Sequence, residues 1–585
     1  MNNAERFSCT VIKNPDNLKY DESIRQFQGC PTVAVTKGGR IFLGWYAGGI
    51  KEPHMNNYNL LIYSDDKGKT WSDPVLIIPS SYTMSVHALD IQLFIDPKGA
   101  LHVCWVQNNT IKSKEPIMKK SGKPAVKVDG YAFVDFKHSE WEVVCNNPDA
   151  EELDFSAPRY LYQGFLRCKP TFLKNGDWLC FAYDQLCNKY GYSISTDDGE
   201  TFTHYYGSEK IGTVFDETMA YERNDGSIRM LARTMHGYAA ECYSYDNGRT
   251  WTKAVSSGIT HADTRLFVQR LPSGRVMLIV NEDSKVRKNI TVKLSEDDGV
   301  TWKYSKLIDA REDISYPDAD CYDGVIYLTY DRGRTSHKEI LFASFTEQDI
   351  IENNDIEVSI VSKPPIAPLK SEIIEAINEN KLIAILRNVS EDKLIKAATA
   401  LYDGGVRLLE ITFDSSEKVS NEDTARMIKM LAEHFNGKMY IGAGTVLNEE
   451  QVRLTKKAGG TFIISPDTKE DVIFEAHLCG LVSIPGVFTP SEITAAVSYG
   501  ADFVKIFPAS AVGSGYIKAV KAPLSNVRIL AVGGIDENNL NEYLSAGANG
   551  VGVGSNIIPS AFLEKDDYDG IKKLAEKYVA VIKNG

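Results

Sequence analysis

The stretch Ser295-Glu-Asp-Asp-Gly-Val-Thr-Trp302 is one of four copies of an eight-residue motif. The other copies are Ser64-Asp-Asp-Lys-Gly-Lys-Thr-Trp71, Ser195-Thr-Asp-Asp-Gly-Glu-Thr-Phe202 and Ser244-Tyr-Asp-Asn-Gly-Arg-Thr-Trp251. In such a motif the aspartate hydrogen-bonds its own turn, the glycine supplies a positive φ, and the aromatic side chain anchors the turn on a neighbouring strand. The motif therefore predicts one turn geometry, repeated between pairs of strands.

The spacing of the copies predicts a propeller. The last three copies begin at residues 195, 244 and 295, which are 49 and 51 residues apart. Short alternating strands flank them, for example at 60–63 and 289–294. A strand-built period near 50 residues is typical of propeller blades. Since 85–150 and 315–350 share the blade pattern without the motif, we predict a six-bladed β-propeller over residues 1–361.

The pattern changes after a proline-rich linker at 362–369, which contains Ser362-Lys-Pro-Pro-Ile-Ala-Pro368. Prolines stiffen such a segment and exclude helix. Short apolar strands then alternate with helices, which indicates a parallel sheet. Eight such units over residues 370–585 predict a (β/α)8 TIM barrel, whose chemistry lies at the C-terminal ends of its strands. The strands are expected at 382–386, 408–413, 439–446, 462–466, 481–486, 503–508, 528–534 and 550–555.

Composition narrows the class of protein. A chain of 585 residues is too long for a single core, and its net charge of −13 argues against a nucleic-acid partner. No apolar run approaches the roughly 20 residues that span a bilayer, and the first residues lack the apolar stretch of a secretion signal. The ten scattered cysteines form no CxxC pair. We therefore expect a cytoplasmic enzyme of small-molecule substrates with reduced thiols, without metal, cofactor or membrane partner.

Lys505 is the first candidate catalytic residue. It stands in Phe503-Val-Lys-Ile-Phe-Pro508, a strand that should be apolar on both faces. Burial of a lysine is costly unless the amine is paired or neutral, and a lowered pKa makes the free amine a nucleophile toward a ketone. The alternatives are a lysine at an exposed strand end or in a buried ion pair.

Other polar residues and glycines fall at the ends of the predicted barrel strands. Glu410 is an inward-facing carboxylate that can shuttle protons near a Schiff base, or serve as the structural partner of Lys505, and the two roles are compatible. The segment Gly442-Ala-Gly-Thr445 offers backbone amides and a hydroxyl group. Gly533-Gly534 and Gly552-Val-Gly-Ser555 end strands seven and eight, where such barrels often bind a phosphate.

These motifs together resemble those of the 2-keto-3-deoxy-6-phosphogluconate and 4-hydroxy-2-oxoglutarate aldolases, in order along 370–585. The matching segments are Ala384-Ile-Leu-Arg387, Gly404-Gly-Val-Arg-Leu-Leu-Glu410, Gly442-Ala-Gly-Thr-Val446, Ile464-Ser-Pro466, Ser483-Ile-Pro-Gly486, Val504-Lys-Ile-Phe-Pro-Ala509, Ala531-Val-Gly-Gly534 and Val551-Gly-Val-Gly-Ser555. The resemblance implies Lys505 as the Schiff-base lysine and Glu410 as the acid/base. It also implies a substrate site of Thr445, Pro466, Phe507, Gly533, Gly534, Gly554 and Ser555, and a trimer formed through the barrel.

One position departs from the family pattern. An arginine that holds the substrate carboxylate is expected after the Glu410 strand, and Asp414 stands there instead. Arg387 resembles the arginine on the first strand of the phosphogalactonate-type relatives and is expected to supply the missing cation. The reaction implied is cleavage of a 2-keto-3-deoxy-(6-phospho) sugar acid, or of 4-hydroxy-2-oxoglutarate, to pyruvate and an aldehyde.

The repeated motifs of the propeller resemble the Asp boxes of sialidases and their BNR-repeat relatives. Glu217, in Asp216-Glu-Thr-Met219, precedes Arg233 by 16 residues, and Arg265 and Tyr316 follow. In sialidases a glutamate activates a tyrosine nucleophile and three arginines hold the substrate carboxylate. The resemblance implies these roles for Glu217, Tyr316, Arg233 and Arg265.

Two sialidase features are missing from their expected places. Gly29, in Gln28-Gly-Cys-Pro31, stands where the first arginine belongs, and the stretch 52–57 lacks the aspartate that protonates the leaving group. We therefore expect little hydrolysis of ordinary sialosides and a site for another acidic sugar. Further candidate lining residues are Asp90, Lys169, Asp318 and Arg332. The alternatives are an aldolase with a non-catalytic carbohydrate-binding propeller, a propeller that only scaffolds, and a true exo-sialidase fused to the aldolase.

Overall fold

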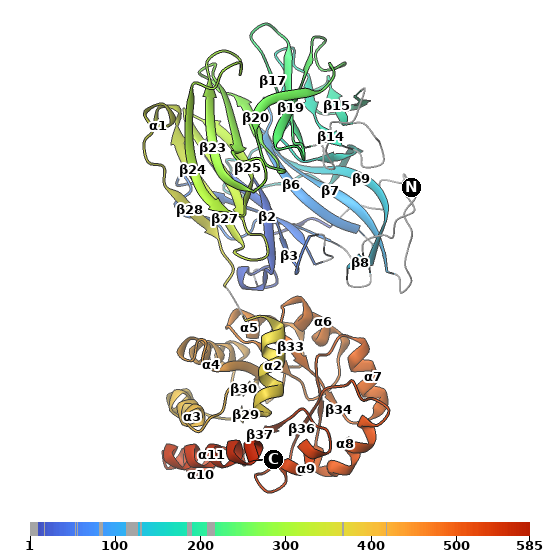
Figure 1. The fold of residues 1–585 in the computed structure, drawn as a ribbon, viewed down its shortest axis with the longest axis vertical. Helices are drawn as coiled ribbons and strands as arrows, with labels where there is room; N and C mark the ends of the chain where they lie inside the picture. The colour runs from blue at the N-terminus through green and yellow to red at the C-terminus, as the bar shows by residue number, and fades with distance from the viewer. Residues whose placement is uncertain are drawn as a thin grey trace. The chain divides into compact units, whose positions relative to one another are not determined.

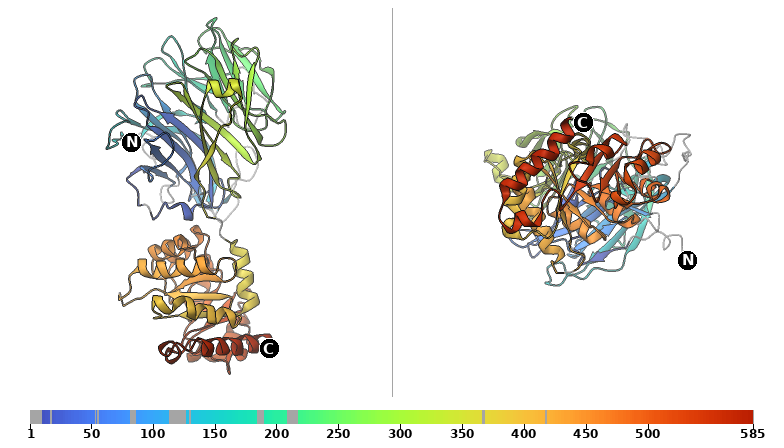
Figure 2. Two further views of the ribbon diagram at one scale, coloured as in Figure 1. Left: turned by 90° about the vertical axis from the view of Figure 1, so that its left-hand side faces the viewer. Right: turned by 90° about the horizontal axis from the view of Figure 1, so that it is seen from below.

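The structure is a computed structural model that describes residues 10–16, 18–52, 54, 56–80, 86–112, 127–128, 131–183, 190–207, 217–365, 368–416 and 418–584. The chain divides into two compact units, Met1–Asn17 with Arg25–Pro364, and Leu18–Ile24 with Pro365–Gly585. The division after Pro364 falls within the predicted linker 362–369, of which residues 366 and 367 lie outside the described residues. The first unit is built of strands, and the second surrounds its strands with helices (Figures 1 and 2).

The first unit is a six-bladed propeller, as predicted. Each blade is an antiparallel sheet whose four main strands follow one another in sequence. The first three blades consist of β2 (Phe27–Val35), β3 (Ile41–Gly48), β4 (Tyr58–Ser64) and β5 (Leu76–Pro79); β6 (Val86–Ile95), β7 (Leu101–Lys112), β9 (Tyr131–Cys145) and β10 (Arg159–Gln163); and β12 (Thr171–Phe172), β13 (Trp178–Cys180), β15 (Gly191–Ser195) and β16 (Thr203–Tyr206). The last three consist of β17 (Thr218–Glu222), β18 (Ile228–Ala232), β19 (Tyr238–Ser244) and β20 (Val255–Thr260); β21 (Phe267–Arg270), β22 (Val276–Asn281), β23 (Lys288–Ser295) and β24 (Tyr304–Glu312); and β25 (Ile314–Tyr322), β26 (Val325–Arg332), β27 (Glu339–Thr346) and β28 (Val358–Ser362).

Short elements complete the propeller unit, and hydrogen bonds join its first and last blades. The short elements are β1 (Ile12–Lys13), β8 (Lys127–Val128), the pair β11 (Phe165–Leu166) and β14 (Ala182–Tyr183), and helix α1 (Glu347–Glu352). Thr32 Oγ1 and the amide of Val33, both on β2, donate to Asp318 on β25 at 2.8 and 3.0 Å. The amide of Gln28 donates to the carbonyl oxygen of Arg334 at 3.0 Å. Residues from opposite ends of the propeller sequence are therefore neighbours at the ring centre.

The repeated motifs form the predicted turns. In the last copy, Asp297 accepts hydrogen bonds from Ser295 Oγ and the amide of Thr301, both at 2.8 Å, while Gly299 has a φ of 79°. The other three copies repeat this arrangement. In the first copy the ring of Trp71 packs edge-on against Phe342 of β27 at 5.3 Å. The motifs thus hold neighbouring strands together, and the aspartates of the motifs accept hydrogen bonds within their own turns.

The second unit is the predicted barrel of parallel strands. Its strands are β29 (Leu382–Leu386), β30 (Leu408–Thr412), β31 (Tyr440–Gly444), β32 (Phe462–Ile464), β33 (Val482–Ile484), β34 (Gly486–Val487), β35 (Val504–Ile506), β36 (Ile529–Val532) and β37 (Gly550–Val553). β33 pairs with β32 and β34 pairs with β35, so the fifth strand, interrupted at Pro485, links the two ends of the sheet. The interruption fits proline's lack of an N–H group for a sheet hydrogen bond.

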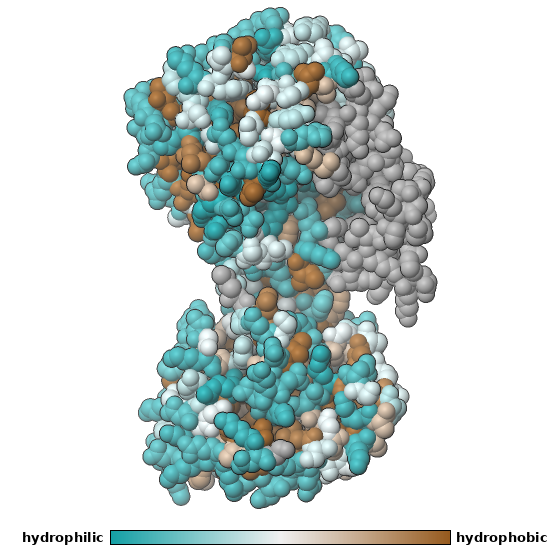
Figure 3. All heavy atoms as spheres, viewed as in Figure 1, coloured by the Kyte–Doolittle hydropathy of each residue, from teal (hydrophilic) through white to brown (hydrophobic). Residues whose placement is uncertain are grey.

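Helices surround the strands of the barrel, and the first of them packs Ile373 and Ile377 in a separate core with strand residues such as Leu408 and Phe462. They are α2 (Lys370–Asn380), α3 (Glu391–Asp403), α4 (Asn421–His434), α5 (Glu449–Lys457), α6 (Glu470–Leu478), α7 (Pro490–Ser498), α8 (Gly513–Lys521), α9 (Leu540–Ser545), α10 (Ser560–Glu564) and α11 (Tyr568–Asn584). The apolar faces of the other helices, such as Leu394, Leu401 and Ile428, pack on the strands in one continuous core. On the face drawn in Figure 3, hydrophilic side chains predominate over the helical unit and hydrophobic ones occur in small groups. Among the described residues, no helix has the length and hydropathy needed to cross a membrane.

Candidate active sites

A cavity of about 440 Å³ opens at the C-terminal ends of the barrel strands. β35 contributes Lys505, β30 contributes Glu410, and Arg387 follows β29 directly. The other predicted residues that line the cavity are Phe507, Gly533, Gly534, Gly554 and Ser555. Eight of the ten residues predicted for the barrel site are therefore brought together around one cavity.

Lys505 is buried, with 7% of its surface exposed. Its ammonium nitrogen lies 4.5 Å from the centre of the Phe507 ring. Burial lowers the pKa of Lys505 and nearby Arg387 lowers it further, while Glu410 opposes both effects. A lysine in this state exposes more neutral amine near neutral pH than a surface lysine does, which suits attack on a carbonyl carbon.

The pKa of Glu410 is shifted in the opposite direction from that of Lys505. Burial raises the pKa of its carboxyl group to about 7, against the lowering influence of Lys505 and Arg387. Its Oε2 atom is buried and lacks a hydrogen-bond partner among the described residues. A side chain at Gly444 would collide with Glu410 Oε1, so glycine is required beside the carboxylate. A carboxyl group that titrates near neutrality can both accept and donate a proton.

The far end of the cavity is formed largely by backbone. Gly533 and Gly534 have φ angles of 95° and 75°, which residues with a side chain rarely adopt. A Cβ atom at Gly554 would meet nothing closer than Ile385 at 3.8 Å, so space for a ligand adjoins it. The cavity here is also lined by Asn556 and Ser560, which our motif-based prediction missed because they lie beyond the glycine segment.

The remaining barrel positions lie outside the cavity lining. Thr445 contacts Arg387, which lines the cavity. The Nη2 atom of Arg387 lies 3.5 Å from the hydroxyl oxygen of Thr445. Pro466 follows β32 at the same edge but does not line the cavity. The carboxylate of Asp414 accepts hydrogen bonds from the amides of Ser416 and Lys418 at 2.9 and 3.0 Å. Asp414 therefore shapes its own loop, and Arg387 is the cation at this end of the cavity.

The propeller brings a second set of predicted residues together at its centre. Tyr316 donates a 2.6 Å hydrogen bond to Glu217, which precedes β17. Arg233 contacts Glu217 at 2.8 Å and the Tyr316 hydroxyl at 3.2 Å. Burial tends to raise the pKa of Glu217, but Arg233 and Arg167 outweigh it and lower the pKa to about 2. Glu217 is therefore an ionised carboxylate placed to accept the phenolic proton.

Arg265 lies beside Tyr316, with its guanidinium carbon 5.2 Å from the ring centre, and is engaged by backbone oxygens. Its guanidinium is buried and donates to the carbonyl oxygens of Arg167, Pro31 and Tyr316 at 2.9 to 3.2 Å. It therefore holds three backbone segments together beneath Tyr316. The other suggested lining residues also serve structure: Lys169 and Asp318 pair with each other at 3.6 Å, and Arg332 pairs with Glu339 at 3.2 Å.

Three arginines that motif matching did not select also contact Tyr316. Arg167 donates to its hydroxyl at 2.9 Å, and the guanidinium carbons of Arg287 and Arg334 lie 5.6 and 4.2 Å from its ring centre. Asp90, which we had suggested, pairs with Arg167 at 2.7 Å. Each of these arginines lies just outside a strand, in no recurring motif, so only their blade-end positions could have marked them.

Both parts of the chain match known families. Residues 373–574, which include the barrel strands and the cavity with Lys505 and Glu410, match the family model of KDPG and KHG aldolase. The 2-dehydro-3-deoxy-6-phosphogalactonate aldolase of Escherichia coli (strain K12) is 37% identical over 177 residues, which cover 30% of this chain and 83% of that protein. The KHG/KDPG aldolase of the same strain is 37% identical over 188 residues, covering 32% and 84%. The chain belongs to the KDPG and KHG aldolase family through its barrel.

The propeller has its own match. Residues 147–327 match the model of the BNR repeat-like domain. Among solved structures, the intramolecular trans-sialidase from Ruminococcus gnavus in complex with oseltamivir carboxylate aligns with a TM-score of 0.46 and 16% identity, covering 58% of this chain and 98% of that one.

Proposed function

We propose that the barrel cleaves a 2-keto-3-deoxy-6-phospho sugar acid to pyruvate and an aldehyde through a Schiff base on Lys505. The observation that carries the proposal is the meeting of Lys505 and Glu410 in one cavity, with the amine's pKa lowered and the carboxyl's raised to about 7. Such opposed perturbations in a cavity mark groups suited to acid–base work. Reductive trapping of pyruvate on Lys505 tests this proposal.

The steps follow from the chemistry of the two groups. The neutral amine of Lys505 adds to the C2 ketone to give a carbinolamine, and Glu410 gives its proton to the departing hydroxyl group, so that water leaves and an iminium ion and the Glu410 carboxylate remain. Removal of the C4 hydroxyl proton by the Glu410 carboxylate breaks the C3–C4 bond, because the iminium accepts the electron pair and becomes an enamine. The protonated Glu410 returns a proton to C3, and water releases pyruvate and the free lysine.

The lining of the cavity favours a phosphorylated substrate with a carboxylate. Arg387 offers a guanidinium near Lys505, which suits the carboxylate next to the C2 ketone. Gly533, Gly534 and Gly554 line the cavity at the ends of the last two strands, where barrels of this kind bind phosphate, and Gly554 has open space beside it. Two relatives, at 37% and 38% identity, are named as phosphogalactonate aldolases, one of them as probable. A six-carbon phosphorylated keto acid of this type is the substrate that we propose, with 4-hydroxy-2-oxoglutarate as the shorter alternative.

Gly554→Asp should separate the two substrates. The new side chain has room, because the Cβ position is 3.8 Å from its nearest neighbour, and its carboxylate would repel a phosphate. We expect KM for the phosphorylated keto acid to rise by roughly 10- to 100-fold, since like charge replaces charge-assisted hydrogen bonds. KM for 4-hydroxy-2-oxoglutarate should change less than about threefold. Steady-state kinetics on both substrates measures the difference.

Gly515→Asp is the matched control. Gly515 has open space around its Cβ position and lies on α8, outside the cavity lining. This variant should leave KM for both substrates unchanged. An equal rise in KM for both substrates in Gly554→Asp would place the phosphate elsewhere.

We propose a second activity for the propeller, hydrolysis of a glycoside of an acidic sugar. Support comes from the 2.6 Å hydrogen bond between Tyr316 and the ionised Glu217, in a site bordered by Arg233, Arg287 and Arg334. Burial raises the pKa of Tyr316 to about 12, so the phenol needs the adjacent base to react. The competing proposal is a propeller that only binds carbohydrate.

Tyr316→Phe distinguishes the two proposals. The change removes the nucleophilic oxygen but keeps the ring against its arginines. We expect hydrolysis of aryl glycosides of acidic sugars by the full chain to fall to background, with pyruvate release by the barrel unchanged. Tyr245→Phe, at a site 75% exposed on a repeat turn, is the control. Hydrolysis that survives in Tyr316→Phe would leave binding as the propeller's role.

A further inference from the structure

Gly29 leaves a space that another arginine fills. A Cβ atom at Gly29 would lie 2.8 Å from both Cγ and Cδ of Arg334 and 2.8 Å from Asp331 Oδ2. Arg334 follows β26 of the last blade, whereas Gly29 lies on β2 of the first blade. The absence of an arginine at position 29 is therefore matched by an arginine from the neighbouring blade, passing through the place that a side chain at 29 would occupy.

The position of Arg334 is fixed by its neighbours. Its Nε atom donates to Asp331 at 2.9 Å, and Asp331 in turn accepts from the amide of Cys30 and from Ser315 Oγ at 2.8 and 2.6 Å. Its Nη1 atom donates to Glu52 at 2.9 Å. The Nη2 atom is buried and has no hydrogen-bond partner among the described residues. A guanidinium held in this way over the Tyr316 ring retains one donor for an anion.

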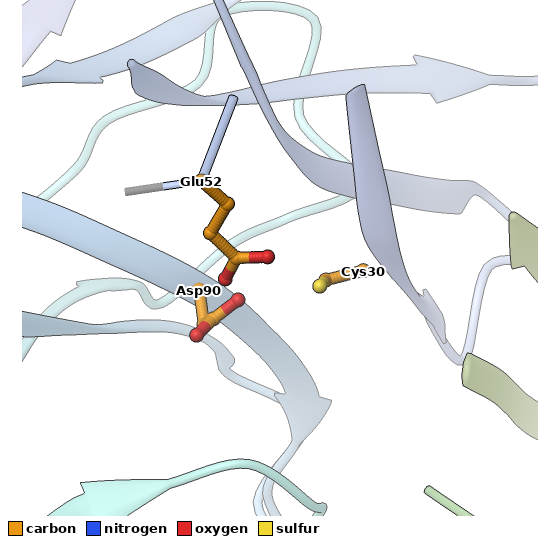
Figure 4. A group of neighbouring side chains, drawn as sticks. All are labelled: Cys30, Glu52 and Asp90. Carbon is orange, nitrogen blue, oxygen red and sulfur yellow. The ribbon is translucent and has the colours of Figure 1, made fainter. Parts of the chain in front are cut away.

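Two neighbouring carboxylates, those of Glu52 and Asp90, lie close to Arg334. Glu52, Asp90 and Cys30 offer atoms that all lie within 4.8 Å of one another, and Figure 4 shows the carboxylates of Glu52 and Asp90 close together. This group is poorly suited to a metal ion. Arg334 and Arg167 already contact the carboxylates at 2.9 and 2.7 Å, and burial raises the pKa of Cys30, so its thiol is neutral.

Two carboxylates this close share a proton more readily than they both ionise. Asp90 is 4% exposed and pairs with Arg167 at 2.7 Å. Glu52 is more open, with 23% of its side chain exposed. Burial and the charge of Asp90 raise the pKa of Glu52, against the opposing effects of Arg334 and Arg167. Glu52 is therefore the more exposed of the two carboxyl groups and the one whose raised pKa favours a bound proton.

We propose that Arg334 binds the carboxylate of the sugar and that Glu52 protonates the leaving group. This inference rests on the glycosidase activity proposed above. As the glycosidic C–O bond breaks, the Tyr316 oxygen bonds to the anomeric carbon, Glu217 takes the phenolic proton, and Glu52 gives its proton to the departing oxygen. Water then attacks the anomeric carbon and gives a proton to Glu52, while Tyr316 leaves and regains its proton from Glu217. The net reaction adds one water to the glycoside.

The proposed binding of the sugar carboxylate by Arg334 is tested in the full-length protein by moving the arginine from position 334 to position 29. Binding of N-acetylneuraminate, 2-keto-3-deoxynononate and glucuronate, each beside its methyl ester, is measured by calorimetry. Arg334→Ala should weaken binding of the preferred acid by roughly 10- to 100-fold and leave its ester unaffected. Gly29→Arg alone should also weaken it, because its side chain collides with Arg334. The double variant Arg334→Ala/Gly29→Arg should regain part of the binding, since the arginine from position 29 enters the space left by Arg334 once Asp331 Oδ2 shifts from its 2.8 Å approach to the new Cβ atom.

Three outcomes would overturn the proposed role of Arg334 in binding the carboxylate. They are unchanged binding in Arg334→Ala, a double variant no better than Arg334→Ala, and failure of the unaltered protein to bind any of the three acids. Should Arg334→Ala fail to fold, Arg334→Lys keeps the charge beside Asp331 but loses the forked donors, and should still weaken binding. Arg275→Ala, a surface arginine paired with Glu296 and Glu347, is the control.

Leaving-group dependence tests Glu52. In Glu52→Gln, hydrolysis of the methyl glycoside of the preferred acid should fall by roughly 10²- to 10⁴-fold, because a poor leaving group needs protonation. Hydrolysis of its 4-nitrophenyl glycoside should fall by less than about tenfold, since that phenolate leaves unaided. Equal losses on both glycosides, or no hydrolysis by the unaltered protein, would overturn the role of Glu52. If Tyr316→Phe hydrolyses normally, the glycosidase mechanism fails, while the calorimetry still decides the role of Arg334.

Discussion

Lys505→Arg should abolish pyruvate release from every keto-acid substrate of the barrel. Arginine keeps a positive charge at the end of β35 but stays protonated at accessible pH, so it cannot add to a ketone. In the unaltered protein, borohydride with pyruvate should attach one reduced pyruvate to Lys505 and inactivate the barrel. In Lys505→Arg no such adduct should form. Peptide mapping by mass spectrometry and a coupled assay for pyruvate provide the two measurements.

The control for Lys505 is another lysine of the same unit. Lys518 is exposed on α8, outside the cavity, and Lys518→Arg should retain full activity and trapping at Lys505. An adduct mapped to a lysine other than Lys505 would reassign the nucleophile. Inactivation without any adduct would argue against a Schiff base altogether. Hydrolysis by the propeller should be unchanged in both variants, which separates the two proposed activities.

The barrel site was largely predictable because its motifs lie at strand ends. In a parallel barrel, the C-terminal ends of all strands meet at one edge, so short motifs along the sequence predict neighbours in space. Lys505, Glu410 and the glycine segments therefore converge on the cavity without further information. Asp414 shows the limit of this reasoning. Its carboxylate accepts hydrogen bonds from amides of its own loop, and a motif comparison does not reveal such local hydrogen bonds.

The propeller centre was harder to predict for a physical reason. Residues from several blades meet at the centre, and the repeated turns have a sequence that is unrelated to these residues. Arg334 and Gly29 lie in different blades, yet one fills the space that the other leaves. Arg265 lies beside the Tyr316 ring as well, and its guanidinium donates to backbone carbonyl groups there. Matching roles to sequence order therefore does not reveal that Arg334, from another blade, also lies against Tyr316.

Glu410→Gln should lower turnover of the barrel by roughly 10²- to 10⁴-fold, the usual contribution of a general acid–base group. It should also shift the pH dependence of trapping. The carboxylate is ionised above its pKa of about 7 and raises the pKa of Lys505 there, so its removal should lower the amine's pKa further. The pH of half-maximal trapping by borohydride should therefore move downward. A Glu410 that served structure alone would leave turnover unchanged once the variant had folded.

Gly444→Ala tests the same carboxylate without removing it. The new methyl group would occupy the position of Glu410 Oε1 and force the side chain away from the cavity, while every titratable group is retained. Turnover should fall as in Glu410→Gln, and combining the two changes should cost little more than either alone, because both remove one function. Glu576→Gln, exposed on α11, is the control and should have no effect. Additive losses in the double variant would mean that Gly444 acts through something other than the position of Glu410.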